Sequence, residues 1–168
     1  MKTRRITTAG LVALCGMAQA AFVTIGDPGN TADTTGYGAV GYTYRISATE
    51  VTIAEFQASG AGNGNENHWN NGTTSTVGTN APASYVSLYE AMKYCNYLTS
   101  GDVNTGYYST SDGGSTYQAN ALSHDAYAAA NGPAYFLPTE DEWYKAAYFK
   151  PDASGYSLYA NGTDTVPT

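Results

Sequence analysis

The chain has 168 residues, of which 12% are charged, and it contains sixteen tyrosines and nineteen glycines. This length is typical of a single domain. Fourteen acidic residues against seven basic ones give a net charge of −7, which argues against nucleic acid and anionic membranes as partners.

The first twenty residues predict a secretory signal peptide. A basic end at 2–5 precedes a short apolar run at 6–17 and the small-x-small sequence AQA at 18–20. We expect cleavage after Ala20, which would place the protein outside the cytoplasm, whether periplasmic, secreted or at the cell surface. The mature chain, 21–168, has no predicted transmembrane segment. It carries four basic against fourteen acidic residues, a net charge of −10.

Two strands and a helix are predicted early in the mature chain. Residues 22–25 are rich in β-forming side chains and are followed by the turn sequence GDPGN. Residues 42–46 alternate in character, so they predict a second strand. Thr52 and Glu55 have the spacing of a capping box, which predicts a helix over about 53–58.

A long loop separates this helix from the next one. Residues 59–83 are mostly small and polar, and a loop of that length is typically functional or mobile. Ser87 and Glu90 then form a second capping box. They predict a helix over about 88–99 that Gly101 ends.

Apolar residues recur along this second helix at spacings of three and four, which predicts one inward stripe. Its members are Leu88, Ala91, Met92, Cys95 and Leu98. Cys95 is the only cysteine after the signal peptide, so the mature chain forms no internal disulfide. A reactive thiol needs an electropositive, partly open site, so we expect Cys95 to be an unreactive core residue.

The segment 104–133 is predicted to be irregular, apart from one hairpin. Tyrosine-containing stretches at 107–108 and 116–117 flank the turn sequence DGG at 112–114. His124 lies in this segment and His68 lies in the long loop, and neither has a second metal ligand at a recognisable spacing. An iron site of both histidines with Asp125 remains an alternative.

A third capping box begins the last predicted helix. Thr139 and Glu142 have the required spacing, and Pro138 precedes them. Glu140, Asp141 and Glu142 fall in the first turn, where the helix dipole favours negative charge. Local chemistry therefore explains these three acids as the start of a helix rather than as a catalytic group.

The rest of this helix is predicted to face inward through Trp143, Ala146 and Ala147, with Trp143 as the anchor. Pro151 is expected to end the helix. The tail at 152–168 is predicted to be a loop.

Three blocks of sequence resemble the formylglycine-generating enzyme, or sulfatase-modifying factor, family. They are ISATEVT at 46–52, the segment 86–98 with its VSLYEA and YCNYL sequences, and LPTEDEW at 137–143. Their order and spacing also agree with the family. The resemblance implies a C-type-lectin-like α+β fold, in which short antiparallel strands and a few helices are joined by long loops.

The best-known members of that family are extracytoplasmic oxidases. They convert a sulfatase cysteine to formylglycine with copper, oxygen and a pair of cysteines, whereas other members are non-haem iron enzymes or catalytically silent binding modules. The family's GNVWEW and RGGSW blocks and its copper-binding cysteines are not found in this chain. We therefore expect 21–168 to be the N-terminal portion of such a domain, incomplete and inactive alone. Phe136 also replaces a usual arginine, which should remove one ion pair.

The first hypothesis for function is an exported sulfatase-modifying-factor-like domain protein whose full form is a formylglycine-generating-type oxidoreductase. The alternative is a non-catalytic, lectin-like extracytoplasmic module that binds a protein or glycan partner. A third hypothesis is that the short chain is complete and pairs with another chain to finish its fold.

No catalytic, cofactor-binding or metal residue is assigned from the sequence. Copper or calcium would belong to a full-length relative rather than to residues of this chain. The resemblance instead singles out seven residues as a structural signature: Glu50, Ser87, Glu90, Pro138, Thr139, Glu142 and Trp143.

Overall fold

The computed structural model of the protein describes residues 21–64, 78–110 and 117–167. The predicted signal peptide, the turn at 112–114 and His68 lie outside these ranges. The expected cleavage after Ala20 therefore stays a prediction.

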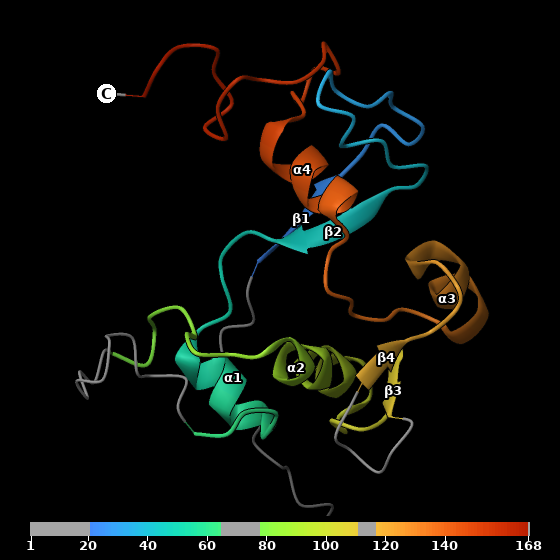
Figure 1. Ribbon diagram of the computed structural model, residues 1–168, viewed down its shortest axis with the longest axis vertical. Coiled ribbons are helices and arrows are strands. Elements are labelled where there is room, and N and C mark those ends of the chain that lie inside the picture. Colours follow the sequence, from blue (N-terminus) through green and yellow to red (C-terminus); the bar gives the residue numbers. More distant parts are fainter. Residues whose placement is uncertain (1–20, 65–77, 111–116, 168) are drawn as a thin grey trace, which may run out of the picture.

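The two predicted N-terminal strands are present and pair with each other. Strand β1 (Phe22–Ile25) runs antiparallel to β2 (Tyr44–Ser47), with Phe22 opposite Ser47. Strand β2 begins two residues later than the alternating sequence predicts. This ribbon forms one side of the upper half of the molecule in Figure 1.

The first two capping boxes are confirmed at the start of helices α1 (Ile53–Ser59) and α2 (Leu88–Ser100). In each box the serine or threonine side chain accepts from the backbone N–H of the glutamate three residues later, and that glutamate accepts from the cap's own N–H. Helix α2 ends as predicted at Gly101, which takes the left-handed conformation with φ of 81°.

The described end of the long loop returns to the beginning of α1. The N–H of Ala83 donates to the carbonyl of Val51 at 2.9 Å, and the N–H of Ile53 donates to the carbonyl of Ala81 at 2.9 Å. Thr52 and Pro82 form an antiparallel bridge between the two segments. The bond from Ile53, and one from the N–H of Ala54 to the carbonyl of Thr79 at 2.9 Å, satisfy N–H groups in the first turn of α1, which would otherwise lack backbone partners.

The predicted hairpin is confirmed, whereas the irregular segment after it is wrong in one part. Strands β3 (Tyr108–Thr110) and β4 (Tyr117–Ala119) pair antiparallel. Residues His124–Asn131 then form helix α3, which the sequence did not indicate. The capping-box signal is absent from the sequence because Ala126, rather than Glu or Gln, stands three residues after Ser123 at the N-cap position.

Helix α4 (Glu140–Tyr148) begins at the third capping box, as predicted. The hydroxyl of Thr139 accepts from the N–H of Glu142 at 3.2 Å, and the Glu142 carboxylate accepts from the N–H of Thr139 at 2.7 Å. The helix ends at Tyr148, ahead of Pro151. The described part of the tail has no helix or strand, in line with the prediction, and an isolated bridge joins Phe149 to Tyr156.

Two aromatic clusters pack against α2 and supply most of the apolar core. Cys95, at 6% exposure, belongs to the first cluster, so its predicted core position is confirmed. Phe56 and Tyr94 belong to the second, with their ring centroids 5.3 Å apart. Leu88, the first residue of the predicted stripe, is 60% exposed, so that part of the prediction is wrong.

The elements form an α+β architecture in two halves, as Figure 1 shows. Helix α4 lies with β1 and β2 in the upper half, and α1 and α2 lie with the β3–β4 hairpin in the lower half. Helix α3 stands between them at one side. Among the described residues, no helix has the length and apolar character that a membrane span requires.

Candidate functional site

The inward face of α4 is charged, which corrects the prediction made for this helix. Glu142 is 4% exposed and Lys145 is 1% exposed, and residues three apart share one face of a helix. Trp143, the predicted anchor, is 53% exposed and lies about a quarter-turn away. The apolar pattern misled because this face is held by hydrogen bonds rather than by aliphatic packing.

Glu142 joins three segments of the chain through its carboxylate. Its oxygens accept from the N–H of Thr139 at 2.7 Å and from the hydroxyl of Tyr42 at 2.7 Å. Nδ1 of His124 lies 3.1 Å from both oxygens. The hydroxyl of Tyr44 donates to the backbone carbonyl of the same residue. The capping role predicted for Glu142 is therefore only one of its roles.

These contacts set the charge state of Glu142. Burial alone would raise the pKa of its carboxyl, but hydrogen bonds from His124, Thr139 and Tyr42 lower it, so the pKa lies below its ordinary value. Burial and the nearby Glu142 carboxylate raise the pKa of the Tyr42 phenol, which keeps it a neutral donor. The site thus contains an ionised carboxylate surrounded by donors.

His124 is the residue of this site that sequence reasoning missed. It was predicted in a loop, but it is the first residue of α3 and forms an ion pair with Glu142. Its ring stacks on Phe136, with centroids 4.3 Å apart. Phe136, where the resemblance implies an arginine, instead supports the imidazole that contacts Glu142. The contact joins residues 18 apart in sequence, so no local pattern reports it.

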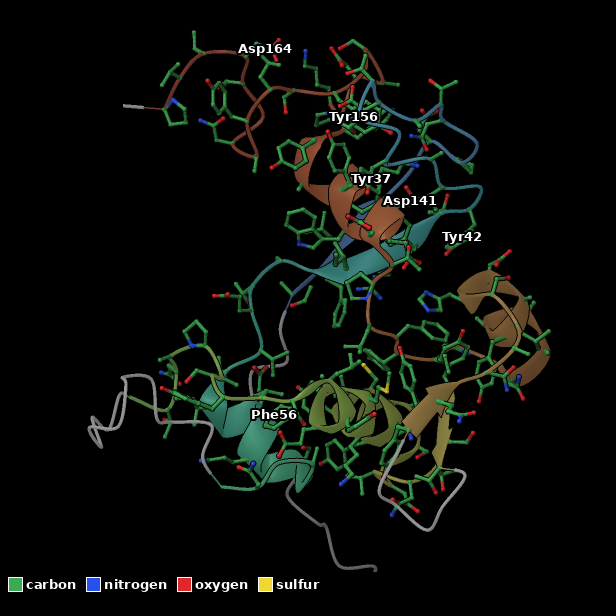
Figure 2. The ribbon with its side chains drawn as sticks, in the orientation of Figure 1. Tyr37, Tyr42, Phe56, Asp141, Tyr156 and Asp164 are labelled. Atoms are coloured by element: carbon green, nitrogen blue, oxygen red, sulfur yellow. The ribbon has the colours of Figure 1, made fainter. Side chains whose placement is uncertain are left out.

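The neighbours of Glu142 on α4 hold the N-terminal loop that follows β1. The Asp141 carboxylate accepts from the N–H of Gly38 at 2.8 Å, and Nζ of Lys145 donates to the carbonyl of Asp27 at 2.8 Å. Gly38 has φ of 94°, and a Cβ there would lie 2.5 Å from the Tyr156 hydroxyl, so a larger residue does not fit. Figure 2 shows both Asp141 and Tyr156 in the upper half of the molecule.

A pocket of about 290 Å³ lies between this loop and the segment after α4. Its wall combines two carboxylates, amide and hydroxyl groups, and two aromatic rings. Hydrogen bonds from Tyr144 and from the backbone lower the pKa of Asp33, so the carboxylate is ionised. The residues that line the pocket are Asp27, Asn30, Thr31, Ala32, Asp33, Thr34, Phe149, Ala153, Gly155 and Tyr156. None of them was singled out from the sequence, because they come from two loops more than a hundred residues apart.

The seven signature residues do not form one site. Pro138, Thr139, Glu142 and Trp143 lie together at the start of α4. Ser87 and Glu90 close a separate cap on α2, and Glu50 is exposed between β2 and α1. Their positions give the group no shared chemical role, and their common feature is that they lie at or just before the beginning of a helix.

Cys95 lies in an environment that suits a structural thiol. It packs with Tyr107, Tyr108 and Tyr117, and burial raises the pKa of its thiol to about 12. Thiolate is the form that binds copper or acts as a nucleophile. The described residues therefore do not fit the copper centre that the family resemblance implies. Within the same ranges, no three His, Cys, Asp or Glu side chains gather as metal ligands.

The two described residues of the iron alternative, His124 and Asp125, do not support it. Nδ1 of His124 contacts Glu142, while Asp125 accepts from the hydroxyl of Ser123 at 2.6 Å. His68, the other proposed ligand, is outside the described residues.

Comparison with known families gives one match. Residues 28–165 match the family described as Sulfatase-modifying factor enzyme 1-like domain. Neither the search of curated proteins nor the search of solved structures gives a match. The matched range covers most of the chain and contains α4, both aromatic clusters and all the residues of the pocket wall except Asp27. The chain therefore belongs to the sulfatase-modifying factor enzyme 1-like domain family.

Proposed function

We propose that this protein is an exported member of its family that binds a polar, uncharged ligand of sugar size in the pocket between 27–34 and 149–156. The observation that carries the proposal is the composition of that wall. Asp27 and Asp33 place carboxylates beside the aromatic rings of Phe149 and Tyr156. A volume of about 290 Å³ is at the lower end of the range for small-ligand sites.

The chemistry of the wall favours a carbohydrate over an apolar molecule. Sugar hydroxyls donate to carboxylates and amides, while the C–H faces of a sugar ring pack on aromatic rings. The Tyr156 hydroxyl is already used, since it donates to the carbonyl of Gly38 at 2.8 Å. Tyr156 would therefore contribute its ring rather than its hydroxyl. Asp33 would contribute its half-buried carboxylate, in which Oδ2 accepts from the Tyr144 hydroxyl and the remaining lone pairs can accept from a sugar.

The proposal predicts that binding of the ligand depends on Asp33. We expect simple neutral monosaccharides and disaccharides to give saturation-transfer NMR signals with the wild-type chain. Asp33→Ala should weaken binding about tenfold, because a hydrogen bond to a charged group contributes roughly 1.5–3 kcal/mol. Titration of the sugar that gives the strongest signal measures the change.

Asp152→Ala is the matched control for this experiment. Asp152 is another loop aspartate, exposed, that accepts a backbone hydrogen bond in its own turn, but it is not part of the pocket wall. The control should bind sugar like the wild type. Binding that survives Asp33→Ala, or no binding of any sugar in the panel, would remove the basis for this function.

Membership of the family supports a second candidate, a formylglycine-generating-type oxidoreductase. We expect residues 1–168 to have no formylglycine-generating activity, because the one thiol after the signal peptide is Cys95, which is buried. A cysteine-containing sulfatase peptide incubated with the chain, copper(I) and oxygen should yield no formylglycine by mass spectrometry. Ellman's reagent should label Cys95 only after unfolding. Product formation that Cys95→Ser abolishes would favour the oxidase instead.

Two finer points belong to the same proposal. The basic end, apolar run and AQA sequence of 1–20 support export, and N-terminal sequencing of the secreted chain should begin at Ala21. The short antiparallel pairs β1–β2 and β3–β4, joined by long irregular segments, support a C-type-lectin-like fold. An experimental structure without that topology would contradict the second point.

A further inference from the structure

His124 and Glu142 join two helices through an ion pair that is almost fully buried. Nδ1 of His124 lies 3.1 Å from both oxygens of the carboxylate, and the two side chains are 11% and 6% exposed. The imidazole is held in place by its stack on Phe136 and by an edge contact with Tyr107, whose centroid lies 5.2 Å away. The geometry suits a charge-assisted hydrogen bond from a protonated imidazole.

Every titratable group that faces this pair can be named from the elements packed around it. Asp125 follows His124 on α3, and its pKa is lowered, first by the hydroxyl of Ser123, so it remains ionised. Tyr42 and Tyr44 approach from the β2 side, and burial raises the pKa of both. Burial also raises the pKa of Tyr107. Histidine is the side-chain type that commonly changes charge between about pH 5 and 8, so the protonation of His124 is the variable that the pair offers.

Helix α3 has few other means of attachment. None of its residues is fully buried, and the hydroxyl of Ser123 donates to the Asp125 carboxylate instead of accepting from a helix N–H. Tyr127 adds two ring contacts, with its centroid 5.1 Å from that of Tyr107 and 6.0 Å from that of Phe136. A short helix with so little burial should open locally at a low free-energy cost.

We propose that the His124–Glu142 ion pair is a pH-sensitive contact that holds α3 against α4 when His124 is protonated and releases it when His124 is neutral. The sign follows from the charges. Protonation adds a cation next to an ionised carboxylate and strengthens the hydrogen bond, whereas deprotonation leaves at most a neutral donor. Opening of α3 would expose the aromatic cluster around Tyr107.

Amide hydrogen exchange of the full chain at about pH 5.5 and about pH 8 tests the proposal, after correction for the intrinsic rate. We expect residues 124–131 to open about tenfold more often at the higher pH, while amides in the middle of α2 stay unchanged. In His124→Gln the difference between the two pH values should disappear. His68→Gln, which removes the chain's other histidine, should behave like the wild type.

Tyr42→Phe keeps the test decisive if His124→Gln does not fold. Removing this hydroxyl leaves Oε1 of Glu142 more dependent on His124, so the ratio between the two pH values should be preserved or larger. Equal protection of α3 at both pH values in the wild type would overturn the proposal. A pH difference that persists in His124→Gln, or one that vanishes in Tyr42→Phe, would also overturn it.

Discussion

Glu142→Ala should lower the free energy of unfolding by about 3–5 kcal/mol, as for other substitutions that remove one partner of a buried ion pair. The substitution leaves the Tyr42 hydroxyl, the N–H of Thr139 and the imidazole of His124 without their acceptor. Unsatisfied buried donors cost roughly 1–3 kcal/mol each. Because a domain of this size is stable by only about 5–15 kcal/mol, urea unfolding should show a large shift.

Glu140→Ala is the matched control, because it changes the same residue type in the same first turn. Glu140 is exposed and should lose only its interaction with the helix dipole, less than about 1 kcal/mol. Equal losses for the two variants would show that Glu142 acts only through the helix dipole. The Glu142→Gln variant should fall between them, since it keeps an acceptor for Tyr42 but loses the charge.

The acid side of the pH profile gives an independent measure of Glu142. Its folded-state pKa lies below the ordinary value of 4.5, so its contribution to stability is complete above about pH 4.5. That contribution is lost as the pH falls through the lower, folded-state pKa. The difference in stability between the wild type and Glu142→Gln should therefore shrink at acid pH.

Local chemistry was enough to predict three of the four helices in the described part of the chain. A capping box brings together two residues three apart, so the pairs Thr52–Glu55, Ser87–Glu90 and Thr139–Glu142 can be seen in the sequence. Helix α3 lacks such a pair, because Ala126 stands three residues after Ser123. Its sequence HDAYAAAN offers helix-forming alanines, and the flanking Ser123 and Gly132 are weaker boundary signals than a capping box.

The candidate site could not be predicted in the same way, because it is built from contacts distant in sequence. His124 reaches Glu142 across 18 residues, and Tyr42 reaches it across 100. The inward direction of α4 was misjudged because an apolar pattern was assumed to mark the buried face. The buried positions are Glu142 and Lys145, and only their partners in other segments explain why charged residues are tolerated there.

Asn96→Ala is expected to be the second strongly destabilising substitution. Asn96 is fully buried in α2. Its side-chain amide bonds both the carbonyl and the N–H of Tyr108, as the backbone of a neighbouring strand would. Nδ2 donates to the carbonyl of Tyr108 at 2.8 Å and to that of Val103 at 3.1 Å, while Oδ1 accepts from the N–H of Tyr108 at 3.1 Å. Gly106 passes so close that a Cβ there would lie 2.4 Å from Oδ1.

Truncation of Asn96 leaves three buried backbone groups unpaired, so we expect a loss of about 3–5 kcal/mol in the free energy of unfolding. Asn131→Ala is the control. Asn131 is exposed, and its amide makes a single bond to the carbonyl of Tyr127, so the loss should stay within about 0.5 kcal/mol.

Asn96→Asp separates the hydrogen bonds of Asn96 from its volume. An ionised carboxylate keeps the bond from the N–H of Tyr108 but faces two carbonyl oxygens without a proton to donate. A protonated carboxyl restores one of those two donors, so burial favours that form and its pKa should be raised. Stability of this variant should therefore rise as the pH falls, opposite to the effect of Glu142. A small, pH-independent loss in Asn96→Asp beside a large loss in Asn96→Ala would mean that cavity formation, and not the unpaired backbone groups, causes the destabilisation.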